Sequence, residues 1–415
     1  MAKLLISFLY VLLLCGCTED GKALATPGGY LGHNNPSPSL VEDKMLTTAF
    51  IDVYPQSEFN FPIKVTSLSD FEQIFIGNST SRDEHRLAHL QMKMFFNNGG
   101  RTAVVRRVEL PLDRELKAED VLPYLNELKN MEEVATLVLP VLSHMTELEA
   151  SKVRAEALQY AKEKNVFFII DPKHSGQLSF EDVILWRDEA QDLISEARSY
   201  AAAYFGRLLV HDDELGIQDM YIDPSATMAG VYSRVTEDEG VHVSPANIQL
   251  IGVDDVEVYL SSEQMGELNA PINGLSICPF RKIPNVGIVA WGTRTLDGNN
   301  SSSFRYIQNR RSISMLDRSI NSYLEKNYLF SSNDGNTWFD IKSVISSFLM
   351  NLFDRGMFVG ASPDEAFNVK VGLGETMTEE DILNGYIKVQ IAVALGYPGE
   401  YELLNFELKL ATGSN

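Results

Sequence analysis

The sequence has few of the residues that build catalytic or covalent centres. It contains three cysteines, Cys15, Cys17 and Cys278, whose spacing matches neither a disulfide framework nor a zinc site. Its 7 histidines are scattered along 415 residues without a convergent set. Bases are scarce too: 35 Lys and Arg face 57 Asp and Glu, which gives a formal net charge of −22. A surface this acidic repels a phosphate backbone, so we expect no nucleic-acid partner.

Motifs for phosphate binding and nucleophilic catalysis are missing as well. Gly99 and Gly100 lack the Lys-Ser/Thr and the helix that follow in a Walker loop, and they predict a helix C-cap instead. No serine stands in a nucleophile-elbow sequence, and the apolar run around Cys278 favours packing. His85 and His89 have helical spacing, but no glutamate lies between them as zinc proteases require. We predict no catalytic, cofactor or metal site.

Three acidic residues leave an enzymatic alternative open. Asp171 ends an apolar run at "IIDP", where α/β enzymes often place catalytic groups, although Asp-Pro is also typical of turns and helix starts. The run "HDDEL" predicts a solvated loop, yet its Asp212 and Asp213 supply two further carboxylates. An exported hydrolase that uses these residues is the corresponding hypothesis.

The first segment differs from the rest of the chain. "MAKLLISFLYVLLLCGC" has one lysine and then an apolar run from Leu4 to Leu14, which has the length of a signal-peptide core and is too short to span a bilayer. The residues from Leu14 to Cys17 resemble a lipobox, with Cys17 as the lipidated residue. A start assigned too far upstream explains the segment without export. Both interpretations stay open.

Helices and apolar strands alternate in the first half of the chain. We predict strands at 46–54, 102–108, 134–142, 166–171 and 206–212, and helices at 82–96, 118–131, 147–164 and 180–199. Ser69 and Glu72 form a capping-box pattern at another helix start. This order predicts an α/β protein with a mainly parallel sheet that helices cover on both faces.

Residues 386–415 contain the clearest strand pattern. Apolar and polar residues alternate in "YIKVQIAVAL" and "YELLNFELKL", with the turn "GYPGE" between them. The alternating apolar residues include Ile387, Val389, Ile391, Val393, Leu404, Phe406 and Leu408. A hairpin this long and apolar predicts a partner strand from another chain, because an unpaired edge promotes aggregation.

Six segments resemble, in the same order, landmarks of the contractile tail sheath proteins of phages, R-type pyocins and phage-tail-like injection systems. They are "LATPGGY", "FFNNGGRTAVVRRV", "DPSATMAGVYSRVTEDEGVHVSPAN", "GIVAWGTRTL", "FRYIQNRRSISMLDRSI" and "MFVGASPDEAFNVKVG". The resemblance extends from Leu24 to the end of the chain and is densest after Tyr221.

The resemblance implies a mechanical function. Sheath subunits stack as six-membered rings around an inner tube and contract on a signal from a baseplate, which drives the tube through a target envelope. The implied partners are further copies of the chain, the inner tube protein, and baseplate and tail terminator or cap proteins. The implied location is a cytoplasmic assembly or a released particle without direct membrane contact. The alternative is an exported lipoprotein with a hydrolase or surface-adhesion function.

The resemblance also implies a division of the chain. A leader at 1–17 precedes an extended arm at 18–47, an outer α/β domain at 48–219, the sheath core domain at 220–385 and a C-terminal β arm at 386–415. In sheaths, both arms add strands to sheets of neighbouring subunits. The N-terminal arm residues here are Leu24, Thr26, Pro27, Gly28 and Tyr30.

A helix of the core domain contacts the tube in this family. The helix around Trp338 to Arg355 is the favoured candidate, and its charged residues are Asp340, Lys342, Asp354 and Arg355. The second candidate is the helix that carries a basic cluster. The cluster consists of Arg310, Arg311 and Arg318. It predicts either a solvated helix face whose arginines pair with Asp317 and Glu325, or a docking site for an acidic partner.

Overall fold

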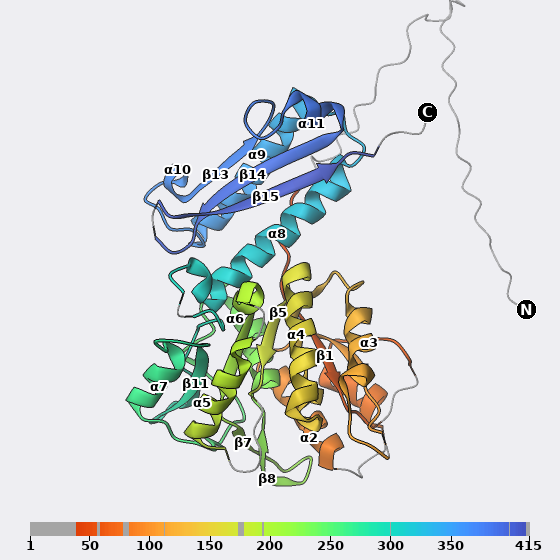
Figure 1. The fold of residues 1–415 in the computed structure, drawn as a ribbon, viewed down its shortest axis with the longest axis vertical. Helices are drawn as coiled ribbons and strands as arrows, with labels where there is room; N and C mark the ends of the chain where they lie inside the picture. The colour runs from red at the N-terminus through yellow and green to blue at the C-terminus, as the bar shows by residue number, and fades with distance from the viewer. Residues whose placement is uncertain are drawn as a thin grey trace, which may run out of the picture. The chain divides into compact units, whose positions relative to one another are not determined.

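Three sheets organise the described part of the chain (Figure 1). The computed structural model describes residues 39–411 except 56–58, 78–82, 112, 173–177, 193–194, 299 and 398. The largest sheet has nine strands in the order β2-β3-β1-β4-β5-β6-β11-β12-β9. These strands are β1 (Thr47–Asp52), β2 (Ile63–Val65), β3 (Thr102–Arg107), β4 (Val134–Val138), β5 (Phe167–Ile170), β6 (Ala201–Phe205), β9 (Ile248–Gln249), β11 (Ile277–Ile283) and β12 (Gly287–Ala290).

The centre of this sheet is parallel, as the alternation of helices and strands predicts. Neighbouring strands run parallel from β3 to β11, and only the outer pairs are antiparallel. Ala49 and Ile51 of β1 belong to one core and Phe50 to another, so alternate residues face opposite sides. This confirms the mixed α/β fold and the helices on both faces.

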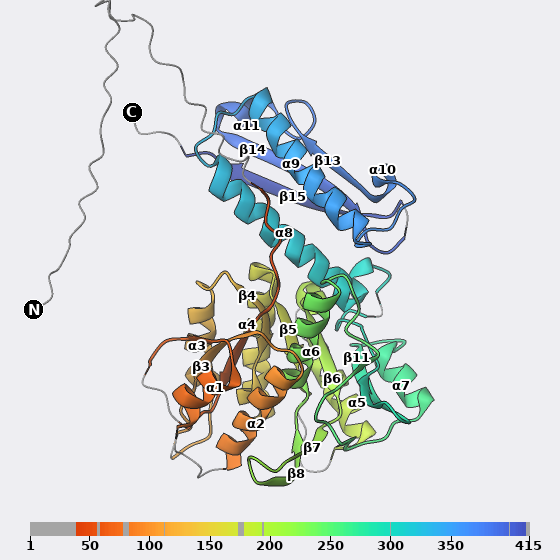
Figure 2. The same cartoon turned by 180° about the vertical axis from the view of Figure 1, so that it is seen from behind.

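The helices divide between these two cores (Figure 2). On one face lie α2 (Asp83–Asn97) and α6 (Ser225–Asp238); on the other lie α3 (Ala118–Leu128), α4 (Glu147–Lys164) and α5 (Phe180–Glu189), with α7 (Ser262–Asn269) contributing Leu268. After α2, Gly99 has φ +103° and the Gly100 N–H donates to the Phe95 carbonyl over 2.9 Å. The glycine pair is thus a helix C-cap, as predicted.

Three local predictions are wrong. The N-cap of α1 (Leu68–Phe71) is Ser67, whose hydroxyl accepts from the Asp70 N–H over 3.1 Å, and not Ser69. The strand predicted at 206–212 is not in the parallel sheet, because β7 (Leu208–Asp212) pairs antiparallel with β8 (Ile217–Ile222) and β10 (Asp255–Val256). The alanine-rich β6 takes its place, and the predicted helix at 180–199 ends at Glu189 and continues as 3-10 turns.

The C-terminal part is a helix pair under a small antiparallel sheet. Its elements are α8 (Ile307–Tyr328), α9 (Gly335–Asp354), α10 (Pro363–Ala366), β13 (Phe367–Val371), α11 (Glu379–Leu383), β14 (Tyr386–Ala394) and β15 (Tyr401–Lys409). The strand order is β13-β14-β15. The predicted C-terminal hairpin is therefore present, within a three-stranded sheet of its own chain.

The large sheet crosses the predicted domain boundary at residue 219. Strand β11, which follows that residue, pairs with β6, which precedes it, and β12 pairs with β11. Residues Leu40–Asn415 form one compact unit. The division into an outer and a tube-lining domain stays a prediction. No described helix is long and apolar enough to cross a membrane.

Candidate functional site

The C-terminal sheet has an open backbone edge at β15. The Leu410 N–H donates to the Gly385 carbonyl over 2.8 Å. Because bonded and non-bonded pairs alternate between antiparallel strands, every second residue back to Leu404 bonds to β14 as well. The N–H and C=O groups of Leu403 and Asn405 therefore point away from β14. Since β15 ends the sheet, no described strand pairs with them.

The apolar side chains of the hairpin are buried within the same chain. They share one core with α9, which contributes Ile341, Ile345 and Leu349. The buried hairpin residues are Ile387, Val389, Ile391, Val393, Leu404, Phe406 and Leu408. These side chains therefore need no second chain to cover them, because the hairpin lies on a helix that the strand pattern could not reveal. What remains open is the backbone of β15, and an inter-subunit role stays a prediction.

Residues 18–38 of the other predicted arm lie outside the described residues. This holds for Leu24, Thr26, Pro27, Gly28 and Tyr30, and for the possible lipidation site Cys17. The described chain begins against the C-terminal core, where Met45 is buried. Glu42 pairs with Arg355 over 2.6 Å, and Asp43 pairs with Arg318 over 2.8 Å. The end of the predicted arm is thus anchored on α8 and just after α9.

Most of the charged residues of the candidate tube-contact helix α9 contact other residues of the same chain. Besides the Arg355 pair, Lys342 lies 3.8 Å from Glu375, and Asp340 accepts from the Tyr328 hydroxyl over 2.6 Å. Asp354 is exposed at the end of the helix. The assignment of these residues to a tube contact stays a prediction, and Asp354 is the charge most accessible to a partner.

The basic cluster is internal, so both of its predicted roles are wrong. Arg310 and Arg311 are buried in α8, whose first two turns are buried at most positions, polar residues included. The Arg310 guanidinium lies 3.6 Å from the centre of the Phe304 ring. Arg311 donates to the Thr236 hydroxyl over 3.0 Å, and burial lowers its pKa to about 10. Charge spacing on a helix could not reveal this, because it does not say which face packs inward.

Asp171 serves as a cap for a neighbouring helix. Its carboxylate accepts from the Ser225 N–H over 2.9 Å and from the Ser225 hydroxyl, at the first turn of α6. Burial is the main cause that raises the pKa of Asp171, and Asp223 adds to it. A cavity of about 160 Å³ lies beside it at the ends of β4 and β5, lined also by Arg154 and Arg207. Asp171 thus has the contacts of an N-terminal cap on a helix far along the chain, whereas the turn or helix start predicted at Asp171-Pro172 itself stays a prediction.

Asp52, which ends β1, is a buried carboxyl that the sequence did not single out. Its Oδ1 has no hydrogen-bond partner among the described residues, and burial raises its pKa to about 8. From about pH 4 to 8 the unfolded chain loses this proton while the folded chain keeps it. Stability should therefore fall as pH rises, by about 1.4 kcal/mol per pH unit from this group.

Asp52→Asn should remove this pH dependence. The melting temperature of the variant should exceed that of the unsubstituted chain at pH 8, with a shallower decline from pH 4, because the amide does not ionise. Asp354→Asn, the same exchange at an exposed site, should leave the decline as it is. Thermal melts across this range measure both, and an unaltered slope in Asp52→Asn would contradict the assignment.

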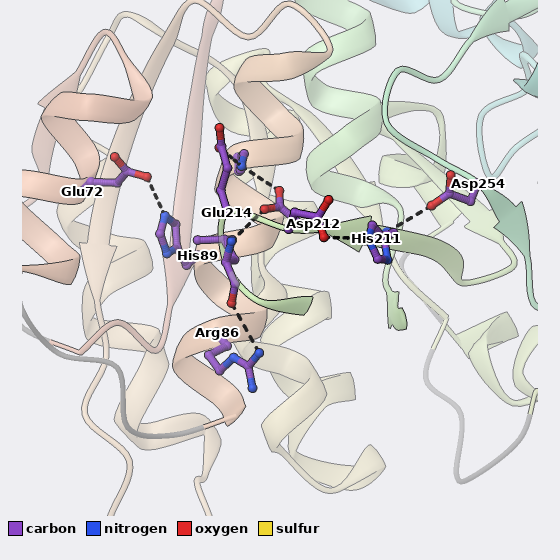
Figure 3. Close-up of polar contacts among 10 residues, drawn as sticks. Glu72, Arg86, His89, His211, Asp212, Glu214 and Asp254 are labelled. Carbon is purple, nitrogen blue, oxygen red and sulfur yellow. Dashed lines mark hydrogen bonds and ion pairs between the residues drawn. The ribbon is translucent and has the colours of Figure 1, made fainter. Parts of the chain in front are cut away.

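The remaining polar candidates lie on α2 and on the β7–β8 hairpin (Figure 3). Lys93 pairs with Asp212 over 2.7 Å and with Glu214 over 2.5 Å, so "HDDEL" is a partly buried contact rather than a wholly solvated loop. His89 lies 2.8 Å from Glu72. His211 contacts Asp213 and the Gln218 carbonyl. The hydrogen bond with this carbonyl is the main cause that raises the pKa of His211, and the Asp213 carboxylate adds to it.

The two ion pairs of Lys93 tie the hairpin to the helix. Arg86 also donates to the Gly216 carbonyl over 3.0 Å, and His85 and His89 line a cavity of about 340 Å³ beside Glu214. Within the described ranges, no three His, Cys, Asp or Glu residues are grouped as metal ligands. Cys278 is buried in β11, and burial raises the pKa of its thiol to about 12, which fits the predicted packing role.

The solved structures similar to this chain include sheath proteins of contractile machines. The PVC sheath complex of an extracellular contractile injection system, in its contracted state, contains a chain 25% identical to this one, with a TM-score of 0.71 over 93% of this chain and 98% of that one. The contracted helical sheath of the anti-feeding prophage contains a chain that is also 25% identical, with a TM-score of 0.71 over 92% of this chain and 99% of that one. The sheath tail protein of Listeria innocua, 11% identical with a TM-score of 0.63 over 88% and 95%, shares the fold. No family model and no curated protein sequence matches the chain.

Proposed function

We propose that this chain, a contractile tail sheath protein, is the repeating subunit of a sheath that surrounds an inner tube and shortens to drive that tube through a target envelope. The observation that carries the proposal is similarity to two sheath subunits over more than nine tenths of both chains. The order of the six sequence segments supports it independently. The comparisons thereby confirm the predicted family and disfavour the exported lipoprotein.

Strand addition between copies would link the subunits. The open edge of β15 can accept an extended segment from a neighbouring copy, with the N–H and C=O groups of Leu403 and Asn405 as partners. Each added ladder hydrogen bond contributes about 1 kcal/mol net. A few such bonds would keep neighbours connected while the folded bodies repack against each other, as shortening of the sheath requires. The arm at 18–47 is the segment we assign to this edge.

The inner tube, baseplate and cap proteins complete the proposed assembly. We assign the tube contact to the exposed side of α9, where Phe339, Met350 and Asp354 are accessible. A phage-tail-like particle is the proposed location. No residue of the chain is assigned a catalytic role in this function, because contraction needs only a difference in free energy between two packings.

Co-production with the tube protein tests the function. Negative-stain microscopy should show striated sheaths around tubes, in long or shortened form. Only monodisperse particles from both proteins would count against the proposal. Growth with a palmitate analogue tests the alternative, since a lipoprotein becomes labelled and a sheath subunit does not.

A further inference from the structure

A short segment without regular secondary structure connects the predicted arm to the large sheet. We call its residues 40–45 the strap. The strap is followed almost directly by β1, a central strand of the large sheet. In Figure 2 the strap (red) runs beside α8 toward that sheet. Leu40 and Met45, at its two ends, pack against the core of the C-terminal part.

Asp43 holds the strap to α8. Its N–H donates to the Ser319 hydroxyl over 2.9 Å, and its Oδ2 accepts from Arg318 Nε over 2.8 Å. Its Oδ1 accepts from the Met45 N–H over 2.8 Å, and Met45 has φ +52°. Left-handed backbone is uncommon for a residue with a side chain, so this turn needs surrounding contacts to hold it.

Arg318 joins the strap to the large sheet as well. Its guanidinium donates to the Val134 carbonyl over 2.6 Å, at the first residue of β4, and to the Glu132 carbonyl over 2.5 Å. Hydrogen bonds from a guanidinium are stronger than those between neutral groups. A second ion pair, from Glu42 to Arg355 over 2.6 Å, holds the strap one residue earlier. Two arginines thus attach the strap to α8, to β4 and to the residue after α9.

This attachment determines how much chain is available to link two copies. With the strap held, the compact unit begins at Leu40. With the strap released, the first residue fixed in a sheet would be Thr47 in β1, and the link would gain the strap residues, about 20 Å of extended chain. Paired strands advance about 3.4 Å per residue, and a slip of one residue moves every side chain to the opposite face. The gain is therefore several times larger than a slip that already disrupts strand pairing.

We propose that Arg318 and Arg355 set the length of the link between neighbouring copies. They are positioning residues, because they act through Asp43 and Glu42, which keep the strap on the folded body while the segment before it pairs with a neighbour. Since the strap leads into β1, a pull on the link passes to the centre of the large sheet and, through Arg318, to α8. The inference rests on the proposed sheath function and identifies the residues that give strand addition a fixed reach.

Neutral substitutions test the two ion pairs of the strap. Asp43→Asn with Glu42→Gln removes both charges and keeps an oxygen that can accept from the Met45 N–H. Ordered sheaths on tubes should become about tenfold fewer, because the effective concentration of a tethered segment falls as its link lengthens and the loss multiplies over the links of a polymer. Hydrogen exchange should become faster at residues 43–45 and stay unchanged in β1. Unchanged exchange in the strap would overturn the proposal, since the strap would still be attached.

Two ion pairs of α3 provide the matched control. Asp120→Asn with Glu127→Gln removes pairs with Arg114 over 2.6 Å and with Arg106 over 2.8 Å, the same distances as in the strap and with side chains of similar exposure. Both double variants should lower the melting temperature to a similar, small extent, but sheaths of the control should be normal. Normal sheaths from the strap variant, or an equal loss in the control, would overturn the proposal.

An insertion tests link length without removing an ion pair. Six Gly and Ser residues between Ser39 and Leu40 should reduce ordered sheaths as strongly as the strap variant does, with an unchanged melting temperature. The same insertion between Pro284 and Asn285, in the exposed β11–β12 turn, should leave sheaths normal. If the insertion after Ser39 gives normal sheaths, link length is not what the strap controls, and the proposal is overturned while the sheath function stands. Absence of sheaths from the unsubstituted chain would overturn the function itself.

Discussion

Asn405→Pro should abolish sheaths while leaving the single subunit folded. The Asn405 N–H points away from β14, so a proline there keeps the β14–β15 ladder and removes a donor only from the open edge. The pyrrolidine ring also blocks the approach of an added strand. Because proline is tolerated on edge strands, the expected loss of stability is small.

Asn405→Ala separates the backbone effect from the side chain. It removes the contact of the Asn405 side chain with Gln390, 3.1 Å away, but keeps the N–H, so sheaths should form. Electron microscopy measures the sheaths, and circular dichroism with thermal melting measures the fold. Sheaths from a folded Asn405→Pro chain would show that β15 is not the edge to which a neighbour adds its strand.

Removal of residues 386–415 should unfold the C-terminal part and not merely detach an arm. The deletion takes away β14 and β15, whose side chains cover Ile341, Ile345 and Leu349 of α9. Burial of one such aliphatic side chain contributes about 1.5–3 kcal/mol, so loss of the hairpin exceeds what a domain of ordinary stability can absorb. No sheath should form, and the chain should precipitate or become protease-sensitive.

Limited proteolysis and thermal melting measure this effect. Cleavage should move to α8 and α9 in the truncated chain, while the intact chain resists in the same region. A truncated chain that melts cooperatively with α9 protected would contradict the described packing. The comparison with Asn405→Pro is informative, because both changes remove sheaths but only the truncation removes the fold.

Sequence periodicity was sufficient to predict the helices and strands whose buried residues recur at regular spacing in their own sequence. The helix at 147–164 has the predicted bounds, and the alternation of Ile387, Val389 and Ile391 predicted a strand with one buried face. The alternation could not say what covers that face, because an apolar stripe fits a helix of the same chain as well as a second chain. The sequence therefore predicted a strand edge in need of a partner but not the helix α9 that covers the apolar face, and the backbone edge of β15 is open in the structure.

Other elements carried misleading local signals. The three alanines of β6 have weak strand propensity, and the sequence placed them beside a helix; their small side chains suit the middle of a sheet covered on both faces. Arg310 and Arg311 looked like a solvated face, but aromatic rings from distant segments, such as Tyr200 and Tyr232, surround them. Asp52 gave no signal, since its burial depends on segments distant in the sequence, such as the one that carries Asp223.

The strand order of the large sheet limits which segments of this protein can be exchanged with those of relatives. Since β11 pairs with β6 and continues into β12 and β9, residues 48–219 are not a cassette that can be swapped between relatives. A graft that replaced them would remove β6, to which β11 bonds, and β7, to which β10 bonds. Variable surface segments therefore have to lie in connections that do not interrupt the strand pairing of this sheet. The β7–β8 hairpin, which side chains hold to α2, is such a connection.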